Sequence, residues 1–550
     1  MKIIFKHEIK PGDKIDSKIL KDLILKHRQI KNIKEFLNPL PPLSISLLDF
    51  GPKYKLYLIK VVKLLKEIKK NNQMIVVYTD YDADGITGGA ILWETLHLLG
   101  FKAMPYVPDR KKEGYGFSIT GIDNVIKEFS PALIISVDHG ITKIKEVAYA
   151  KSKGIKVIVT DHHLKADKTP KADAVFHIPA LSGSGVAYFF AKELFKEFKS
   201  QTTRDSLLTG NFLTDYLALA SIGTIADLVP LIGPSRSIVK YGLEVFSKVK
   251  RFGIKHILRQ AGISDKKITP YEVGFIIAPR INAVGRLHHA IDALRLLCTT
   301  DEKKAFDLAQ KVGLTNTERQ DLVKKSVEEA LAKIPKPPIS KIIVLVSDHW
   351  NEGIIGLIAS KVSEQFYRPA IVLTKNDGFY KASARSIPSF HITNFLRSLK
   401  KFLVDVGGHA QAAGFTISKE KLEKFIKEAE KQADKLIKDK DLERMITADI
   451  KIPVSKINIE MVKDLESLEP FGIGNPKPTF LSETELTGAQ LFGKTNTHLK
   501  VFIGSLELIA FNKADKFNEL SRGEKIKIVY TLEIDRWNGR EKLRGKILWF

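Results

Sequence analysis

Acidic residues and histidines follow several short apolar runs of this chain. Residues 80–85 read Asp-Tyr-Asp-Ala-Asp-Gly, residues 137–140 read Val-Asp-His-Gly, and residues 160–163 read Thr-Asp-His-His. A fourth segment, residues 223–227, ends in Asp227. Carboxylates and imidazoles that converge from separate strand ends suit a pair of divalent cations, and such pairs hydrolyse phosphate esters. Taken together, the segments predict a catalytic metal site.

Each segment alone has a plainer explanation. The Asp-Ala-Asp-Gly run also occurs in calcium loops and turns, and Asp227 alone is typical of a helix surface. The chain has a single cysteine, Cys298, so it contains no set of thiolate ligands and no intramolecular disulfide. Mixed carboxylate and imidazole ligands favour Mn²⁺ or Mg²⁺.

The elements that must position these residues indicate a parallel sheet covered by helices. Short apolar runs at 74–77, 133–137 and 156–159 are typical of buried strands, and the spacing in 86–99 predicts a helix. Strands that alternate with helices favour an α/β fold. In such sheets ligands bind beyond the carboxyl ends of the strands. Asp82, Asp84, Asp138 and His162 all follow such runs, so one site can collect them.

The pattern along the chain predicts five regions. Residues 1–55 are interpreted as an N-terminal extension, 56–235 as the catalytic α/β domain and 236–335 as a helical connector. A second α/β pattern covers 336–445, after the proline-rich segment 333–338. From 446 to 550 short alternating runs predict a small all-β domain.

Composition limits the class of protein. The length of 550 residues suggests three or four domains at roughly 100–200 residues each. No apolar run reaches the roughly 18 residues of a membrane helix, and the N-terminus lacks a signal-peptide pattern, so we expect a cytoplasmic protein.

The formal net charge of +25 favours a nucleic-acid partner, although a lysine-rich genome is the alternative explanation. Residues 1–70 contribute +10 of it, with 17 Lys or Arg and 7 Asp or Glu, which is usually a solvated face.

The four segments resemble the motifs of the DHH phosphoesterase superfamily, and within it the chain resembles the RecJ single-strand-specific exonucleases. The resemblance runs from about residue 50 to the C-terminus and includes residues 108–116, 278–286, 381–386, 407–414 and 468–476. It implies an α/β fold class: a parallel-sheet DHH domain, a helical connector, an α/β DHH-associated domain and a C-terminal β-barrel of the oligonucleotide-binding (OB) type.

The resemblance also implies the residues of the site. The metal ligands would be Asp82, Asp84, Asp138, His162 and Asp227, with Asp138 bridging both ions and Asp80 as an additional acid. His163 would face the phosphate or orient a ligand, and His409 would hydrogen-bond the scissile phosphate. Many members have histidine where this chain has Tyr78, so Asp80 or water would fill that coordination place. Asn351 is a second departure from the family pattern and receives no role.

Substrate contacts are expected from arginines, because guanidinium groups clamp phosphate. Arg110, Arg280, Arg286 and Arg385 are interpreted as lying in Gly-, Ser- or Asn-containing loops. A pocket of Arg110, Ser383 and Arg385 would anchor a terminal 5′-phosphate. The full set of expected substrate-binding residues is Arg110, Tyr115, Arg280, Asn282, Arg286, Ser383, Arg385 and Gly408. Tyr115 would stack on a base, with a place in the core as the alternative. In the terminal domain the candidates are Phe492, Lys494, Phe511, Lys513, Arg536 and Trp537.

The function implied is a metal-dependent 5′→3′ exonuclease that degrades single-stranded DNA to 5′-mononucleotides in repair and recombination. It would use two Mn²⁺ or Mg²⁺ ions, act as a monomer, and work with a single-strand-binding protein and a helicase. Two other classes remain open. One is a DHH phosphoesterase of short oligonucleotides or cyclic dinucleotides, and the other is a non-catalytic single-strand-binding scaffold.

Overall fold

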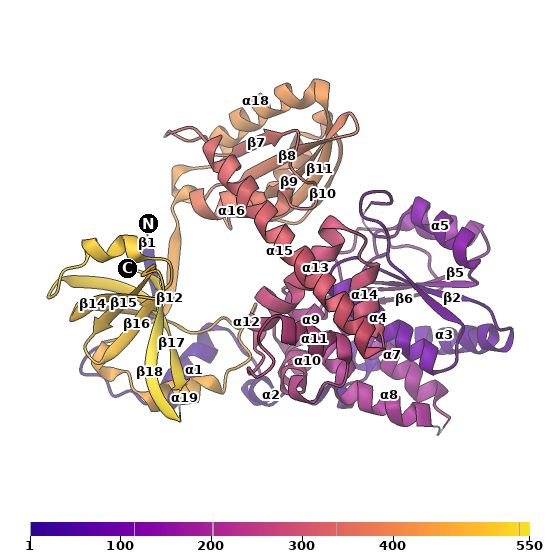
Figure 1. Ribbon diagram of the computed structural model, residues 1–550, viewed down its shortest axis with the longest axis horizontal. Coiled ribbons are helices and arrows are strands. Elements are labelled where there is room, and N and C mark those ends of the chain that lie inside the picture. Colours follow the sequence, from indigo (N-terminus) through magenta and orange to yellow (C-terminus); the bar gives the residue numbers. More distant parts are fainter. Residues whose placement is uncertain (1, 115, 201–202, 337, 538) are drawn as a thin grey trace. The chain divides into compact units, whose positions relative to one another are not determined.

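The computed structural model describes residues 2–114, 116–200, 203–336, 338–537 and 539–550, and its contacts divide the chain into two compact units. The larger unit comprises Ile3–Pro279, Ala290–Ala309 and Ile446–Phe550. The smaller unit comprises mainly Arg280–His289 and Gln310–Met445. The larger unit contains two sheets and the smaller unit one, each with its own helices (Figure 1).

The catalytic region of the larger unit is built on a five-stranded sheet in the order β3-β2-β4-β5-β6. All four strand pairs are parallel, as predicted. Its central strands are buried along nearly their whole length, which explains their unbroken apolar runs. The strands are β2 (Ile75–Thr79), β3 (Ala103–Tyr106), β4 (Leu133–Val137), β5 (Lys156–Asp161) and β6 (Ala174–His177).

Helices cover both faces of this sheet (Figure 1). Ile122 and Val125 of α5 and Val147 of α6 pack with Val76 and Ile134 of the strands. The opposite face contacts α3, α4 and α7. The helices are α3 (Lys53–Lys70), α4 (Ala83–Leu98), α5 (Ile119–Phe129), α6 (Ile144–Ser152) and α7 (Gly183–Phe198).

The predicted connector is helical. It contains most of α10 (Gly233–Glu244), then α11 (Phe252–Gln260), α12 (Pro270–Glu272), a π-helical turn at Val273–Ile277, α13 (Ala278–Leu287), α14 (Ile291–Cys298) and the long α15 (Glu302–Ala332). Two further helices, α8 (Thr203–Leu213) and α9 (Asp215–Ala226), end the region predicted as the catalytic domain. No helix among the described residues is long and apolar enough to span a membrane.

The smaller unit contains a mixed sheet in the order β10-β11-β9-β8-β7. Only β7 and β8 are parallel, and the other three pairs are antiparallel. The strands are β7 (Ile343–Ser347), β8 (Ala370–Asn376), β9 (Phe379–Arg385), β10 (Leu403–Gly408) and β11 (Ala412–Ser418). The helices are α16 (Ile355–Phe366), α17 (Ile392–Ser398) and α18 (Lys419–Leu436).

The C-terminal sheet has eight strands in the order β1-β12-β13-β17-β18-β16-β15-β14. Its first strand, β1 (Lys2–Glu8), comes from the N-terminal segment, so residues 1–55 do not form a separate extension. Leu20 and Ile24 of α1 (Ser17–His27) pack in the same core as Met461 and Leu465 of α19 (Ile459–Glu466). The domain is therefore not all-β. The other strands are β12 (Met445–Lys451), β13 (Thr479–Glu485), β14 (Gly488–Phe492), β15 (His498–Ile503), β16 (Leu506–Ala510), β17 (Lys525–Trp537) and β18 (Arg540–Trp549), and a short α2 (Ile33–Leu37) follows α1.

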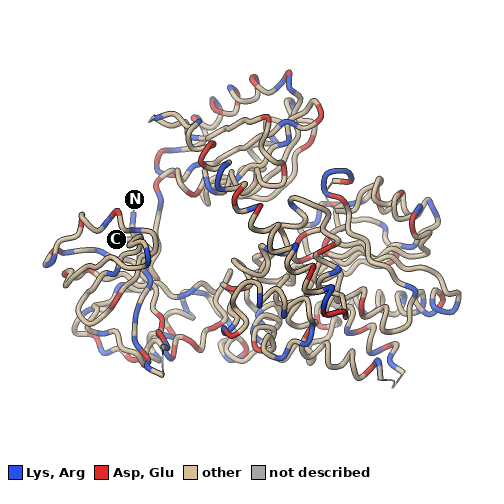
Figure 2. Tube along the Cα trace, in the orientation of Figure 1, with Lys and Arg blue, Asp and Glu red and all other residues tan. Residues whose placement is uncertain are grey.

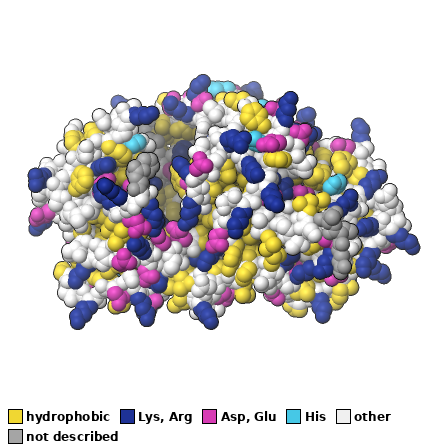
Figure 3. Space-filling model, turned by 60° about the horizontal axis from the view of Figure 1, so that its bottom comes forward, with side chains coloured by type: hydrophobic (Ala, Val, Ile, Leu, Met, Phe, Trp, Pro, Cys, Tyr) yellow, Lys and Arg dark blue, Asp and Glu magenta, His cyan; other side chains and the backbone are white. Residues whose placement is uncertain are grey.

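Lys and Arg occur along the whole chain (Figure 2), although residues 1–70 carry +10 of the net +25. On the face that Figure 3 shows, Lys and Arg side chains spread across the surface with Asp and Glu among them. Net charge alone therefore does not mark a binding surface on this face.

Candidate metal centre

Five carboxylates and two imidazoles converge at the carboxyl edge of the parallel sheet. Ligand atoms within 4.8 Å of one another form three overlapping groups: Asp80, Asp82 and Asp138; Asp84, His162 and Asp227; and Asp138, His162 and His163. They follow β2, β4, β5 and α9, the places where the motifs end. The rule that parallel strands present ligands at their carboxyl ends thus describes this cluster.

Backbone amides hold the acids of the first motif. Asp82 caps α4, and its Oδ1 accepts hydrogen bonds of 3.0 Å from the amides of Asp84 and Gly85. Asp84 accepts from the amides of Gly183 and Ser184, at 2.6 and 2.9 Å. Because these two amides begin α7, the helix N-terminus stabilises the negative charge of Asp84.

Asp138 occupies a constrained position. Its φ of 68° lies in the left-handed region, which costs a non-glycine residue about 1–2 kcal/mol. The backbone of Gly183 passes so close that a Cβ there would lie 2.4 Å from Asp138 Oδ1. Only glycine fits at position 183, so the start of α7 helps to fix the Asp138 carboxylate.

Two ligand atoms face each other without a hydrogen bond. His162 Nε2 lies 3.1 Å from Asp138 Oδ1, and neither atom has a hydrogen-bond partner among the described residues. Burial lowers the pKa of His162, so its imidazole is neutral at pH 7. Burial, reinforced by Asp84 and Asp82, raises the pKa of Asp138. The lone pair of the neutral His162 Nε2 and the negative Asp138 Oδ1 repel each other when they are buried together without a hydrogen bond. A cation between them removes this cost, so the residues present fit a divalent metal.

Asp227, at the end of α9, completes the cluster. It is the C-cap of α9, and its Oδ2 lies 3.4 Å from His162 Nε2. Burial and the charge of Asp84 raise the pKa of Asp227 to about 8. Two carboxylates whose oxygens lie within 4.8 Å repel each other by about 3–4 kcal/mol at an effective dielectric constant of 20. A bound cation removes that repulsion.

Asp161 organises the cluster without belonging to any of the three groups. Its Oδ1 accepts from the amides of His162 and His163 and pairs with His163 Nδ1 at 2.8 Å, while its Oδ2 accepts from the Ile141 amide. Burial opposes ionisation of Asp161, but these contacts, above all with His163, lower its pKa below the usual range. Burial likewise lowers the pKa of His163, but Asp161 raises it to about 9. The motif pattern assigned no role to Asp161, because a supporting acid and a ligand acid look alike in a sequence.

Tyr78 points away from the cluster. Its ring is fully buried on the α5 face of the sheet and packs against Tyr106, Phe117 and His139. Its hydroxyl donates to the Gly116 carbonyl at 3.3 Å. Tyr78 therefore offers no ligand, whereas Asp80 lies in the first group of possible ligands.

Arg110 lies beside the first motif, with its guanidinium 5.2 Å from the centroid of the Tyr81 ring. This places one predicted phosphate-binding cation next to the cluster of acids within the larger unit. Tyr115 lies outside the described residues.

Ser383 and Arg385 form a second polar group, in the smaller unit. Arg385 Nη1 donates to Ser383 Oγ at 3.1 Å and to the Ala384 carbonyl at 2.8 Å. A Cβ at Gly356 would lie 3.0 Å from both Ser383 Oγ and Arg385 Nη2, so the first turn of α16 closes over the pair. Arg385 belongs to strand β9, so its prediction as a loop residue was wrong. Burial lowers its pKa.

The loop prediction was also wrong for Arg280 and Arg286. Both lie in helix α13 with Asn282. This helix continues directly from α12 and the π-helical turn, so Pro279 lies inside an unbroken helical stretch from Pro270 to Leu287. Arg286 Nη1 donates to the Gly353 carbonyl at 3.2 Å, and burial lowers the pKa of Arg280. The two arginines thus project from one helix of the smaller unit.

The glycine-rich motif at 407–409 ends strand β10 and enters the turn of the β10–β11 hairpin. Gly408 pairs with Ala413, and the exposed His409 donates its amide to the Ala412 carbonyl at 2.7 Å. Asn351, the departure from the family pattern, accepts from the Gly353 amide at 2.8 Å and so shapes the turn before α16.

On the C-terminal sheet three rings form an aromatic cluster. Phe492, His498 and Phe511 lie within 5.3–6.4 Å of one another between centroids, and Lys500 and Lys546 lie over two of the rings. Phe511 is half exposed. Arg536, by contrast, is paired with Glu466 and Glu541.

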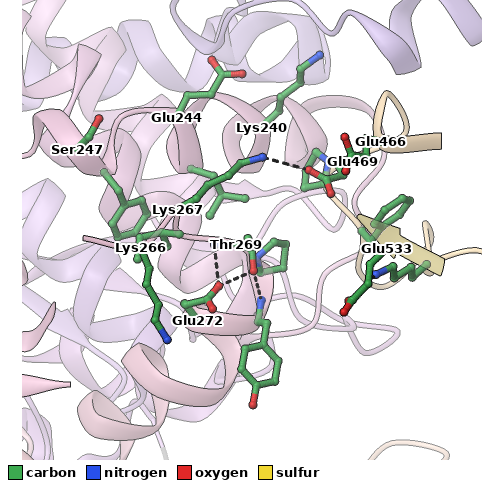
Figure 4. A pocket seen from close by; sticks show the side chains of 18 of the residues that line it. Lys240, Glu244, Ser247, Lys266, Lys267, Thr269, Glu272, Glu466, Glu469 and Glu533 are labelled. Atoms are coloured by element: carbon green, nitrogen blue, oxygen red, sulfur yellow. Dashed lines mark hydrogen bonds and ion pairs between the residues drawn. The ribbon is translucent and has the colours of Figure 1, made fainter. Parts of the chain in front are cut away.

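A cavity of about 940 Å³ lies between the connector and the C-terminal sheet of the larger unit (Figure 4). Lysines and glutamates line it together, and Lys267 pairs with Glu469 at 3.4 Å across it. Among the described residues, none of the metal-ligand candidates lines this cavity. Its opposite charges neutralise one another, so it lacks the character of a catalytic site.

Comparisons with known proteins agree with this arrangement. Family models match residues 74–223 (DHH family, N-terminal domain), 340–435 (DHHA1 domain) and 448–548 (RecJ OB domain). The single-stranded-DNA-specific exonuclease RecJ of Haemophilus influenzae is 30% identical over 572 residues, covering 99% of this chain and 98% of the relative. RecJ of Bacillus subtilis is 35% identical over 495 residues, covering 87% of this chain, and the chain spans 61% of that relative.

Solved structures lead to the same group of proteins. RecJ from Thermus thermophilus in complex with Mn²⁺ matches 100% of this chain and 79% of its own, with a TM-score of 0.81 and 27% identity. The Mg²⁺ complex matches 100% of this chain and 78% of its own, with a TM-score of 0.74 and 26% identity. The resemblance predicted from the motifs and the predicted fold class are thereby confirmed.

Proposed function

The chain belongs to the RecJ family of single-stranded-DNA-specific exonucleases, and from this premise we propose that it degrades single strands from the 5′ end and releases 5′-mononucleotides. The observation that carries the proposal is the buried pair His162 Nε2 and Asp138 Oδ1, which face each other without a hydrogen bond. The structures of RecJ from Thermus thermophilus hold Mn²⁺ in one case and Mg²⁺ in the other, and a divalent cation is the cofactor here.

The proposed metal ligands are Asp80, Asp82, Asp84, Asp138, His162 and Asp227. Asp138 is the candidate bridging ligand, because it belongs to two of the three groups of converging ligand atoms. A pair of divalent cations bound here would supply a water of lowered pKa and would polarise the phosphoryl oxygens.

The chain itself supplies charge for the phosphate. In the metal-free fold Asp161 raises the pKa of His163 to about 9, so the imidazole carries a positive charge at neutral pH. A cationic imidazole beside the ligand cluster stabilises the negative charge that develops on the phosphoryl oxygens. Asp161 therefore acts as a positioning residue that keeps His163 charged and oriented. His409 and Gly408, at the β10–β11 turn, are proposed as further phosphate contacts.

The 5′ polarity is attributed to an anchoring pocket for the terminal phosphate. Ser383 and Arg385 already lie in hydrogen-bonding contact, and the first turn of α16 adds backbone amides, which favour anions. In the larger unit Arg110 is proposed as a further phosphate contact, and in the smaller unit Arg280, Asn282 and Arg286 are proposed as contacts to the following nucleotides. An end held in this way would allow only a terminal phosphodiester to reach the metal ions.

The C-terminal OB domain is proposed to hold the strand beyond the cleavage site. Phe492, His498 and Phe511, flanked by Lys500 and Lys546, combine stacking surfaces with cations, the usual means of binding single strands. We further propose that the protein is a cytoplasmic monomer acting in repair and recombination. A single-strand-binding protein and a helicase are its proposed partners.

A digestion assay tests the proposal. Single-stranded and duplex DNA, labelled at either end and carrying 5′-phosphate or 5′-hydroxyl, is incubated with the chain in Mn²⁺ or in EDTA, beside the Asp138→Asn variant. The proposal predicts Mn²⁺-dependent release of mononucleotides from the 5′ end of single strands only. Cleavage restricted to di- or trinucleotides would support a short-oligonucleotide phosphoesterase instead, and binding without cleavage would support a scaffold.

A further inference from the structure

Helix α3 presents an unusually basic outer face. Its 18 residues contain seven lysines and one acid, Glu67, and all seven lysines are exposed. Within the described part of the chain no ion pair involves any of these lysines. Figure 2 shows lysines recurring along this helix. They are Lys53, Lys55, Lys60, Lys63, Lys66, Lys69 and Lys70.

A second helix of the same length shows that lysine-rich composition does not by itself produce such a face. Helix α18 also has 18 residues and carries six lysines, but it carries five acids as well. Its net charge is therefore +1, against +6 for α3. The lysine content of the two helices is nearly equal, so the excess on α3 comes from the missing acids.

Two aliphatic side chains stand in the middle of the basic face. Leu56 is 64% exposed and Ile59 is 58% exposed. They lie three residues apart, so they are neighbours on the helix surface, and Lys60 and Lys63 continue the same stripe. The buried side of α3, with Leu58, is already used against the catalytic sheet. Leu56 and Ile59 therefore do not pack into the core of the larger unit.

We propose that the outer face of α3 is a docking surface for an acidic segment of a partner protein that carries apolar side chains. Carboxylates of such a segment would pair with the lysines, and its apolar side chains would cover Leu56 and Ile59. A nucleic-acid backbone fits less well, because phosphates would engage the lysines but leave the aliphatic pair in water. An amphipathic segment lying along a helix is a recurring mode of peptide recognition.

The first turn of α3 is linked to the catalytic edge of the sheet. The Tyr54 hydroxyl, in the first turn of α3, donates to the His177 carbonyl, and the His177 ring contacts the His163 carbonyl at 2.7 Å. A partner docked on α3 would therefore be held on the same domain as the metal centre. The proposal concerns a protein contact and does not depend on the chemistry proposed for that centre.

Fluorescence anisotropy with the full chain tests the proposal. The probes are a labelled synthetic peptide of glutamates with leucines at helical spacing, the same peptide with serine for leucine, and labelled single-stranded and duplex DNA. The α3 variants are Lys60→Glu/Lys63→Glu and Leu56→Ser/Ile59→Ser. The matched controls are Lys424→Glu/Lys427→Glu, an exposed pair with the same spacing on α18, and Leu436→Ser at the exposed end of α18.

The leucine peptide is expected to bind the unchanged chain and to lose about tenfold in affinity in each α3 variant, with less than twofold loss in the controls. The serine peptide is expected to bind more weakly than the leucine peptide. Equal affinity for both peptides, no binding to the unchanged chain, or the same loss in the α18 variants would overturn the proposal. DNA affinity that falls in the α3 charge variant, with the Leu56→Ser/Ile59→Ser variant unaffected, would assign the surface to nucleic acid and also overturn it.

Discussion

The metal centre and the C-terminal sheet treat charge in opposite ways. At the metal centre five carboxylates lie together, and the His162–Asp138 pair has no internal hydrogen bond. On the C-terminal sheet Arg544 pairs with Glu533 at 2.7 Å and with Asp535 at 2.9 Å. Charges that neutralise one another inside the protein leave little to offer a ligand, whereas an unbalanced buried cluster requires one. The substitutions below test this contrast.

The largest effect is expected from Asp138→Asn. It removes a ligand atom from two of the three groups, so exonuclease activity should fall by roughly 10³-fold or more. Initial rates on a 5′-labelled single strand in Mn²⁺ measure this. The control is Asp123→Asn, an exposed acid that accepts from Tyr149, and it should keep full activity. Similar losses in both variants would mean that position 138 has no special role.

Asp161→Asn tests the supporting acid. Loss of a residue that orients ligands typically reduces activity by about 10–100-fold. The pKa of His163, raised to about 9 by Asp161, should fall toward its ordinary value, while the number of bound Mn²⁺ ions stays the same. NMR titration of the histidines and metal analysis provide the two readouts. An unchanged His163 titration would contradict the positioning role.

Phe511→Ala tests the aromatic cluster on the C-terminal sheet. Because the nearby charges are paired with one another, we expect stacking on these rings to bind the DNA. Each stacked base contributes about 1–3 kcal/mol, so affinity for a long single strand should fall by that amount. Cleavage of a very short 5′-phosphorylated strand should be little affected. Anisotropy titrations with long and short strands separate the two. Equal loss on both lengths would argue against a role remote from the cleavage site.

Without metal, the stability of the protein should fall as pH rises, and bound Mn²⁺ should offset this loss. The pKa of Asp227 is about 8 in the metal-free fold, far above that of an unfolded aspartate, so the folded state binds extra protons below pH 8. The stability that these protons give is present at low pH and is lost as pH rises through 8. Mn²⁺ replaces the protons, so its stabilising effect, about 2.7 kcal/mol at 100 times Kd, should grow from pH 6 to pH 8.5. Thermal unfolding with and without Mn²⁺ measures this, and a larger Mn²⁺ effect at pH 6 would contradict it.

Arg536→Gln should have the smallest effect. The guanidinium contacts Glu466 and Glu541, so it has little charge to offer a phosphate, and DNA affinity should change by less than twofold. Titrations at two salt concentrations check the result. A loss comparable with that of Phe511→Ala would show that the pairing does not prevent Arg536 from binding DNA.

The sequence predicted the positions of the clustered acids and histidines well, because a physical rule connects them. Strand ends in a parallel sheet share an edge, so Asp82, Asp138 and His162 could be brought together from local patterns alone. The contribution of Gly183 could not be predicted, because its close approach to Asp138 depends on how α7 packs. Asp161 was missed because its function depends on which atoms donate to it.

The pairing of distant strands and the helix that contains Arg280 were harder to predict. Strand β1 joins β12, more than four hundred residues later, and no local pattern encodes that partner. The segment around Arg280 was predicted as a loop because it contains Asn and Gly, although it lies in a helical stretch that runs from Pro270 to Leu287. For β1 the contact between distant segments, rather than local propensity, decides the partner.

Anomalous X-ray scattering at the manganese edge, from crystals of the chain grown with Mn²⁺, tests the central claim most directly. The account predicts two manganese peaks among Asp80, Asp82, Asp84, Asp138, His162 and Asp227, with Asp138 in contact with both. No manganese at this cluster, or ions held only by other residues, would contradict it.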